Sequence, residues 1–177
     1  MHVLITGAVG VGKSTLTDKL IKQVKRPVFG FRTKKTEEDA SGNARIYIHP
    51  ATGALIHSDG NAVGLSKPDG ADPYPEVFNS IGVRLLTGIP AGAIVLMDEL
   101  GYLESQAGLF CEAVMRILDG PYHVLAVIKA RHTPFLESVR SHKKGKLWTV
   151  TLENRDLLYN EILSELVSLD AGSPFLS

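Results

Sequence analysis

Short apolar runs alternate along the chain with longer segments of helical periodicity. Five of these runs have the length and composition of buried strands, at residues 2–6, 27–33, 93–97, 122–128 and 147–151. Segments with apolar positions on one helical face lie between them, at residues 14–24, 77–86, 106–118, 134–140 and 154–169. Because strands alternate with helices, the pattern predicts an α/β fold with a mostly parallel central sheet.

The middle of the chain departs from this alternation. Residues 45–49 and 54–57 are strand-like and flank the turn-prone segment 50–53, which predicts a small β-hairpin insertion. Residues 59–75 are rich in Gly, Asp and Pro, and they predict a long loop of the kind that often serves as a lid. The polar segment 34–44 is expected to be a second exposed loop.

The length of 177 residues is typical of one domain that can bury a sizeable core. We expect this domain to occupy residues 1–170, with the hairpin and loop insertion at about 44–75. Residues 171–177 are expected to form a frayed C-terminal tail.

A phosphate-binding motif lies between the first predicted strand and the first predicted helix. The segment Gly7-Ala-Val-Gly-Val-Gly-Lys-Ser14 fits G-x-x-x-x-G-K-[ST] at every fixed position. In this motif backbone N–H groups and the positive end of the helix hold phosphate oxygens. Lys13 is predicted to reach the outer phosphates, and the Ser14 hydroxyl to contact Mg²⁺. The residues expected to bind the nucleotide are Gly7, Ala8, Val9, Gly10, Val11, Gly12, Lys13, Ser14 and Thr15.

Two acidic residues, Asp98 and Glu99, directly follow the apolar run 93–97. Ligands of parallel α/β sheets collect at the carboxyl ends of the strands, so these side chains are expected near the phosphates. Mg²⁺ takes a few oxygen ligands and keeps part of its water shell, so Ser14 and Asp98 are the predicted metal residues. Glu99 is the predicted general base that orients an attacking water. The alternative is that one or both carboxylates simply face solvent.

Three arginines are candidates to stabilise negative charge on the transferred phosphoryl group. Arg32 ends the second predicted strand, Arg131 follows the strand 122–128, and Arg155 opens the last predicted helix. A cation in the first turn of a helix opposes the helix dipole by roughly 0.3–1 kcal/mol, which hints at another partner for Arg155, either a ligand or a structural carboxylate. The adjacent Asp156 weakens this hint. The predicted catalytic residues are Lys13, Glu99, Arg131 and Arg155. For each arginine an ordinary surface role is the alternative.

Composition excludes several classes of protein. The formal net charge is zero, from 19 basic and 19 acidic residues, so no nucleic-acid binder is indicated. No apolar run is long enough to cross a membrane. The phosphate motif begins at residue 7, which leaves no room for a signal peptide before it. Cys111 is the only cysteine, which rules out an internal disulfide and suits the reducing cytoplasm.

Several motifs occur together in a characteristic order. They are the phosphate motif, residues 30–33 (Gly-Phe-Arg-Thr), residues 98–104 (Asp-Glu-Leu-Gly-Tyr-Leu-Glu), residues 126–131 and residues 154–156 (Asn-Arg-Asp). Together they resemble the thermophile-type (cancer-related) nucleoside-triphosphatase family of P-loop proteins.

The resemblance covers about residues 2–165 and implies a three-layer, RecA-like α/β core. It also implies that the acidic pair lies on the strand beside the phosphate-motif strand. The implied activity is slow, Mg²⁺-dependent hydrolysis of ATP, GTP and other nucleoside triphosphates with broad base tolerance. Lys13, Ser14, Asp98 and Glu99 match the family's nucleotide, metal and catalytic positions, and Glu104 matches an acidic residue of the family.

Two other functions are compatible with the motifs. A P-loop kinase for a nucleoside, nucleotide or small metabolite would carry the same loop, but kinases of this size commonly close an arginine-rich lid. Residues 59–75 contain no arginine and only Lys67. A nucleotide-switched regulatory module is the third hypothesis, with the loops 34–44 and 59–75 as switch elements and an unidentified protein as partner.

Overall fold

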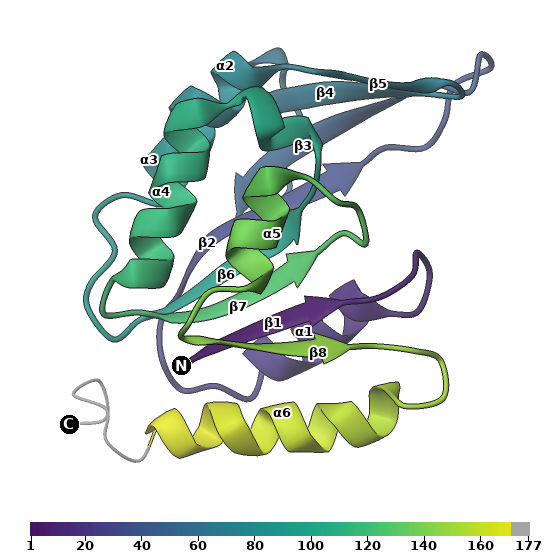
Figure 1. Ribbon diagram of the computed structural model, residues 1–177. Helices are drawn as coiled ribbons and strands as arrows, with labels where there is room; N and C mark the ends of the chain where they lie inside the picture. The colour runs from purple at the N-terminus through teal and green to yellow at the C-terminus, as the bar shows by residue number, and fades with distance from the viewer. Residues whose placement is uncertain (171–177) are drawn as a thin grey trace.

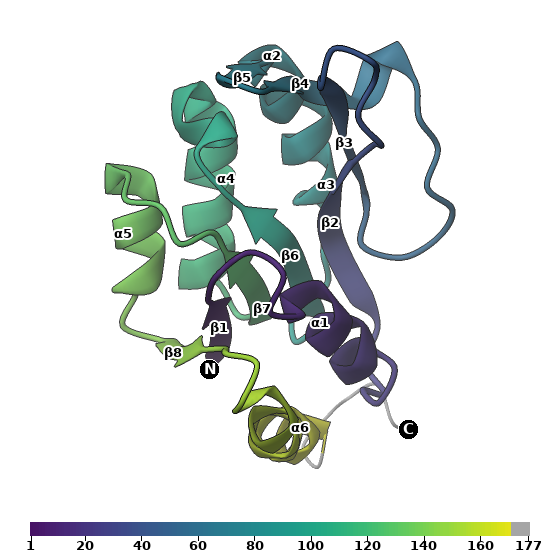
Figure 2. The ribbon, with the colours of Figure 1, turned by 90° about the vertical axis from the view of Figure 1, so that its right-hand side faces the viewer.

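The computed structural model describes residues 1–170, and the predicted tail of residues 171–177 lies outside this range. An eight-stranded sheet lies between two layers of helices (Figure 1 and Figure 2). The strands are β1 (His2–Thr6), β2 (Val28–Lys35), β3 (Ala44–Pro50), β4 (Ala62–Lys67), β5 (Gly70–Pro73), β6 (Ile94–Leu100), β7 (His123–Ile128) and β8 (Gly145–Thr149).

The longer helices are α1 (Lys13–Ile21), α4 (Gly108–Asp119), α5 (Pro134–Arg140) and α6 (Arg155–Asp170). A further helical segment consists of α2 (Pro75–Val77), a π-helical turn (Phe78–Gly82) and α3 (Val83–Leu85). Single 3₁₀ turns lie at Asp59–Asn61 and Leu103–Gln106. In the described residues no helix combines the length and the apolar character that a bilayer span requires.

The sheet has a parallel part and an antiparallel extension. Its strand order is β5-β4-β3-β2-β6-β7-β1-β8. The pairs β2–β6, β6–β7, β7–β1 and β1–β8 are parallel. The pairs β2–β3, β3–β4 and β4–β5 are antiparallel. This arrangement confirms the predicted α/β class with a mostly parallel sheet.

Each face of the sheet is covered by its own helices (Figure 2). Leu16 and Leu20 of α1 share one apolar core with Leu158 and Ile162 of α6. The other core contains α4 and α5 and the helical segment 75–85, with the Phe31 and Phe110 rings 5.3 Å apart in an edge-on arrangement. These two cores on either side of one sheet make the fold a three-layer one.

The family resemblance had implied that the acidic strand β6 lies beside β1. In the structure it does not, because β7 lies between them. β7 suits this interior position since its residues 124–128 are all apolar and buried. The carboxyl ends still coincide, because Ile5 of β1 and Asp98 of β6 both pair with Val127. The expectation about strand neighbours is wrong, but Asp98 is level with the start of the phosphate motif.

The predicted hairpin of residues 45–49 and 54–57 is also wrong. β3 pairs with β2 and β4 instead, and residues 52–60 are exposed and contain no strand. Residues 62–73, expected to be part of a loop and lid, form the hairpin β4–β5. These strands contain Gly, Asp and Pro, which have low strand propensity, so pairing with β3 determines their conformation.

Candidate functional site

The phosphate loop (residues 7–14) connects β1 to α1, and glycine is required at two of its positions. Gly12 has a φ of +92°, in the left-handed region, at the residue that precedes α1. A Cβ atom on Gly7 would lie 2.3 Å from the carbonyl oxygen of Val150. These two positions let the loop turn tightly while it stays packed against the residue that follows β8.

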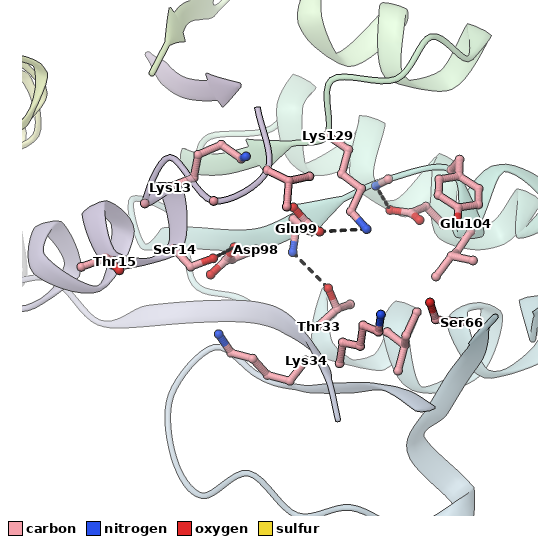
Figure 3. A pocket seen from close by; sticks show the side chains of 18 of the residues that line it. Lys13, Ser14, Thr15, Thr33, Lys34, Ser66, Asp98, Glu99, Glu104 and Lys129 are labelled. Carbon is pink, nitrogen blue, oxygen red and sulfur yellow. Dashed lines mark hydrogen bonds and ion pairs between the residues drawn. The ribbon is translucent and has the colours of Figure 1, made fainter. Parts of the chain in front are cut away.

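The loop opens onto a cleft of about 620 Å³ at the carboxyl edge of the parallel strands (Figure 3). The ends of β2, β6 and β7 form its walls, together with the start of α1 and the 3₁₀ turn after β6. Ile46, Ser66 and Phe78, from β3, β4 and the π-helical turn, also line it. The antiparallel extension therefore contributes to the cleft.

The predicted nucleotide-binding residues divide into two groups. Those that line the cleft are Val9, Gly10, Gly12, Lys13, Ser14 and Thr15. Three do not line the cleft: the side chain of Val11 belongs to the apolar core, Gly7 is buried, and Ala8 is exposed.

Lys13 is held over the phosphate loop. Its Nζ donates hydrogen bonds to the carbonyl oxygens of Gly7, at 2.8 Å, and Ala8, at 2.7 Å. Burial lowers the pKa of Lys13, and the negative charge of Glu99 opposes this shift. The ammonium group is therefore a desolvated cation at the floor of the cleft.

Asp98 is buried at the end of β6, with one oxygen facing the phosphate loop. The Ser14 hydroxyl donates to Asp98 Oδ1 at 3.3 Å (Figure 3). Asp98 Oδ2 lies 3.5 Å from Nη1 of Arg32, which also contacts Asp18 at 2.5 Å. Burial raises the pKa of Asp98, and the positive charges of Lys34 and Arg32 oppose the shift.

Ser14 and Asp98 fit a magnesium ion held partly by substrate. A hydroxyl and a carboxylate oxygen, 3.3 Å apart, are the hard ligands that Mg²⁺ takes. Within residues 1–170 there is no cluster of three or more His, Cys, Asp or Glu side chains that could hold a metal ion. The protein thus offers two oxygens, which suits an ion that completes its shell with phosphates and water.

Glu99 points into the cleft and pairs with a lysine. Its Oε1 lies 3.0 Å from Lys129 Nζ, and its backbone N–H donates to the Thr33 hydroxyl at 3.2 Å. Both side chains of the ion pair are about one-third exposed, at 28% for Glu99 and 34% for Lys129. The carboxylate therefore has a fixed direction and still meets water.

Neither Lys129 nor Thr33 is among the site residues predicted from the sequence. Lys129 directly follows β7, and Thr33 lies near the end of β2. The same argument from strand ends that led to Asp98 could have led to Lys129. It could not have shown that Lys129 pairs with Glu99, since the two residues are 30 positions apart in the chain.

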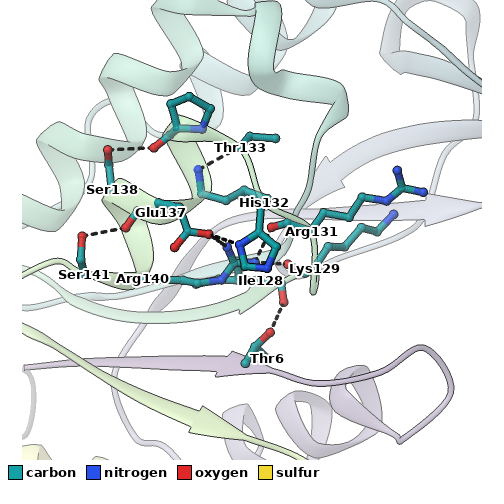
Figure 4. Close-up of polar contacts among 12 residues, drawn as sticks. Thr6, Ile128, Lys129, Arg131, His132, Thr133, Glu137, Ser138, Arg140 and Ser141 are labelled. Atoms are coloured by element: carbon teal, nitrogen blue, oxygen red, sulfur yellow. Dashed lines mark hydrogen bonds and ion pairs between the residues drawn. The ribbon is translucent and has the colours of Figure 1, made fainter.

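A network around Arg140 holds the segment that carries Lys129 (Figure 4). Arg140 donates to the backbone carbonyls of Lys129 and, at 2.7 Å, Arg131. Its other nitrogen contacts Glu137 at 2.7 Å, and the Thr6 hydroxyl donates to the carbonyl of Ile128 at 3.0 Å. This anchors the backbone after β7 and leaves the Lys129 side chain to reach Glu99.

Glu104 is fully buried beside this site. Its Oε1 accepts a hydrogen bond from the Gly101 N–H at 2.6 Å, which closes the turn after β6. Burial raises the pKa of Glu104 to about 7, against the opposing effect of that hydrogen bond. Glu104 thus holds the shape of the segment that follows Asp98 and Glu99.

Neither Arg131 nor Arg155 is among the residues that line the cleft. The Arg131 guanidinium lies 4.7 Å from the centre of the Tyr102 ring, and Tyr102 itself is part of the wall. Arg155 lies on the other side of the phosphate loop, close to Gly12. The structure therefore brings Lys13, Ser14, Asp98 and Glu99 together and leaves the two arginines outside the cleft.

Comparisons of the whole chain with known proteins agree with one another. A sequence model of a family described as NTPase matches residues 2–163. The chain is 33% identical over 175 residues to the nucleoside-triphosphatase THEP1 of Thermotoga maritima, with 94% of this chain and 95% of that protein covered. It is 30% identical over 183 residues to the human cancer-related nucleoside-triphosphatase, with 92% and 95% covered. The crystal structure of THEP1 from Aquifex aeolicus matches with a TM-score of 0.68 and 26% identity, over 94% of this chain and 99% of that one.

Proposed function

Since the chain belongs to this NTPase family and is a nucleoside-triphosphate hydrolase, we propose that it cleaves the γ-phosphate of ATP, GTP and other nucleoside triphosphates with Mg²⁺ and with broad base tolerance. The observation that carries the proposal is the convergence of Lys13, the Ser14–Asp98 pair and Glu99 on one cleft. Positive charge, a metal-binding pair and a directed carboxylate are the parts that phosphoryl transfer to water needs.

In this proposal Ser14 and Asp98 would hold a magnesium ion, which when bound would supply positive charge to the phosphate oxygens. The backbone N–H groups of the phosphate loop bind the same phosphates from the other side. Lys13 exchanges its bonds to the loop carbonyls for bonds to the outer phosphates. Each of these contacts stabilises the negative charge that gathers on the γ-phosphoryl group as it is transferred.

Glu99 orients the attacking water and takes up one of its protons. The water oxygen forms a new bond to the γ-phosphorus while the bond to the bridging oxygen breaks, so the products are a nucleoside diphosphate and inorganic phosphate. The ion pair with Lys129 holds the Glu99 carboxylate pointed into the cleft. Arg131, above Tyr102 at the wall, is our candidate for a further positive charge near the γ-phosphate.

Phosphate release from ATP, GTP, CTP and UTP tests this proposal. We expect steady turnover with Mg²⁺, none with excess EDTA, and loss of activity in Lys13→Ala. Transfer of the γ-phosphoryl group to an added nucleoside or metabolite, without release of phosphate, would instead establish the kinase alternative. Turnover that is the same with EDTA would contradict the role of Mg²⁺.

We also propose that the protein acts in the cytoplasm, where nucleoside triphosphates are abundant. Its single cysteine, Cys111, is compatible with a reducing compartment. Fractionation of cells that produce the protein would test the location.

A further inference from the structure

A second, smaller cavity lies on the other side of the phosphate loop. This recess, of about 130 Å³, is lined by Gly12, Thr15, Leu16, Lys19, Arg155, Asp156 and Tyr159. Gly12 and Thr15 also line the main cleft, so the two cavities meet at the start of α1. A molecule bound in the cleft could therefore extend into the recess across Thr15.

The direction of the substrate follows from the contacts in the cleft. The groups suited to the γ-phosphate, Glu99 and Lys129, lie on the far side of Asp98 from Thr15 (Figure 3). A triphosphate whose outer end is at Glu99 has its inner phosphate at the first residues of α1. The nucleoside then leaves the loop on the Thr15 side, where the recess opens.

The recess has the chemistry of a surface for a flat aromatic ring. Tyr159 offers a half-buried ring from α6, and Arg155 a planar guanidinium from the first turn of the same helix. In the part of the chain that the structure describes, the Arg155 side chain has no ion-pair or hydrogen-bond partner. Asp156 does not neutralise it, since consecutive residues on a helix do not face each other. Arg155 is thus an unpaired cation at a helix N-terminus, where a cation is unfavourable unless it has another partner.

The connection between β8 and α6 holds these residues in place. Asn154 Oδ1 accepts a hydrogen bond from the Thr151 N–H at 2.8 Å, and Asn154 Nδ2 donates to the Thr149 carbonyl at 3.0 Å. The next residue is Arg155, and its Nη1 lies 3.4 Å from the position that a Cβ on Gly12 would take. The exposed guanidinium therefore lies beside the phosphate loop.

We infer that the recess binds the base of the nucleoside triphosphate by its ring faces, through Tyr159 and Arg155. This inference rests on the proposed function, since it takes the triphosphate to lie in the main cleft. Stacking is tolerant of sequence because every base has a π face, so the recess accepts purines and pyrimidines. Arg155 acts on the base and not on the transferred phosphate, and this contact is the physical origin of broad base tolerance.

The test compares nucleotides with inorganic tripolyphosphate, which has no base. Tyr159→Ala should raise the KM for ATP, GTP, CTP and UTP by roughly 5- to 100-fold, the range expected for one stacked ring, with kcat little changed. The affinity for Mg²⁺–tripolyphosphate, measured by calorimetry, should stay at the wild-type value. Tyr159→Phe keeps the ring, so its KM values should match those of the wild type. Arg155→Met should raise the KM for all four nucleotides.

Leu157→Ala is the matched control, because Leu157 is exposed on α6 and does not line the recess. An unchanged KM in Tyr159→Ala would overturn the inference. So would an equal loss of tripolyphosphate affinity, which would indicate damage to the phosphate loop. A fall in kcat without a rise in KM in Arg155→Met would assign Arg155 to the reacting phosphate. If the wild type shows no turnover, the proposed function fails by itself, and nucleotide titrations of the same variants still test the recess.

Discussion

The two cavities that meet at Gly12 hold their charged groups in opposite ways. In the cleft, Asp98 is buried and in contact with Ser14 and Arg32, and Glu99 is paired with Lys129. In the recess, Arg155 and Asp156 are exposed, and Tyr159 offers mainly a ring. Directed, paired charges suit one reaction at one phosphorus atom, because they are aligned before the transition state forms. A ring and an unpaired planar cation stack on the face of a base and do not depend on its hydrogen-bonding edge, so they suit bases of different kinds.

The largest expected effect comes from removing the carboxylate at the cleft end. Glu99→Gln keeps the size of the side chain and loses the base, so kcat should fall by about 10²- to 10⁴-fold, the usual contribution of a general base. The KM for nucleotide should change little, because the phosphate loop is intact. Single-turnover phosphate release measures this; kcat within about threefold of wild type would remove Glu99 from the chemistry and break the contrast between the two ends.

Substitution of Lys129 tests whether the cation of the ion pair contributes to kcat as much as Glu99 does. Lys129→Met should lower kcat by about 10²-fold, because one positive group that holds Glu99 near the γ-phosphate is lost. Exposed Lys143→Met serves as the control, since it removes the same charge away from both cavities. Equal activity of the two variants would show that the contact between Lys129 and Glu99 has no part in catalysis.

The ionisation of buried Glu104, beside the cleft, should affect the free energy of unfolding. Its pKa is raised from 4.5 to about 7, so the folded state binds a proton that the unfolded state has lost between these pH values. The free energy of unfolding should therefore fall as pH rises from about 4.5 to about 7, by up to about 3 kcal/mol.

Glu104→Gln stays neutral and keeps an acceptor for the Gly101 N–H, so this part of the pH dependence should vanish. The variant should then be more stable than wild type at pH 8 and similar to it at pH 4. Urea unfolding at several pH values, with wild type and variant in parallel, measures the difference; the same slope in both proteins would rule out an effect of Glu104 ionisation.

The smallest expected effect is the energetic coupling between the cleft and the recess. Glu99 and Tyr159 share no contact, so their effects on kcat/KM should multiply in the variant Glu99→Gln/Tyr159→Ala, with a coupling energy within about 0.5 kcal/mol of zero. A coupling above about 1 kcal/mol would mean that base binding and phosphate chemistry are not separate functions of the two cavities.

Much of the site could be predicted because its signals are local. The phosphate loop is one continuous motif whose glycines are required by the backbone itself, as at Gly7 and Gly12. Asp98 followed from an apolar strand and the rule for strand ends, and the structure brings it to Ser14. The pairing of Glu99 with Lys129 and the recess around Tyr159 could not be read from the chain, because each joins elements that are distant in sequence.

The antiparallel extension shows the same limit for the fold. β4 and β5 carry weak strand signals of their own, and their pairing with β3 overrides the low propensity of Gly, Asp and Pro. Residues 54–57 have a strand-like pattern but find no partner strand and remain exposed. Propensity is a weak guide where the hydrogen bonds of a strand come from another part of the chain.

The sequence by itself determined the alternation of strands and helices, the phosphate loop and the acidic residues at the end of β6, because periodicity and short motifs act over a few neighbouring residues. Only the tertiary structure decided that β7 lies between β1 and β6, that Lys129 faces Glu99, and that Arg155 lies outside the cleft. Strand order and side-chain meetings depend on the packing of the whole sheet between its two helical layers, and no local segment contains that information.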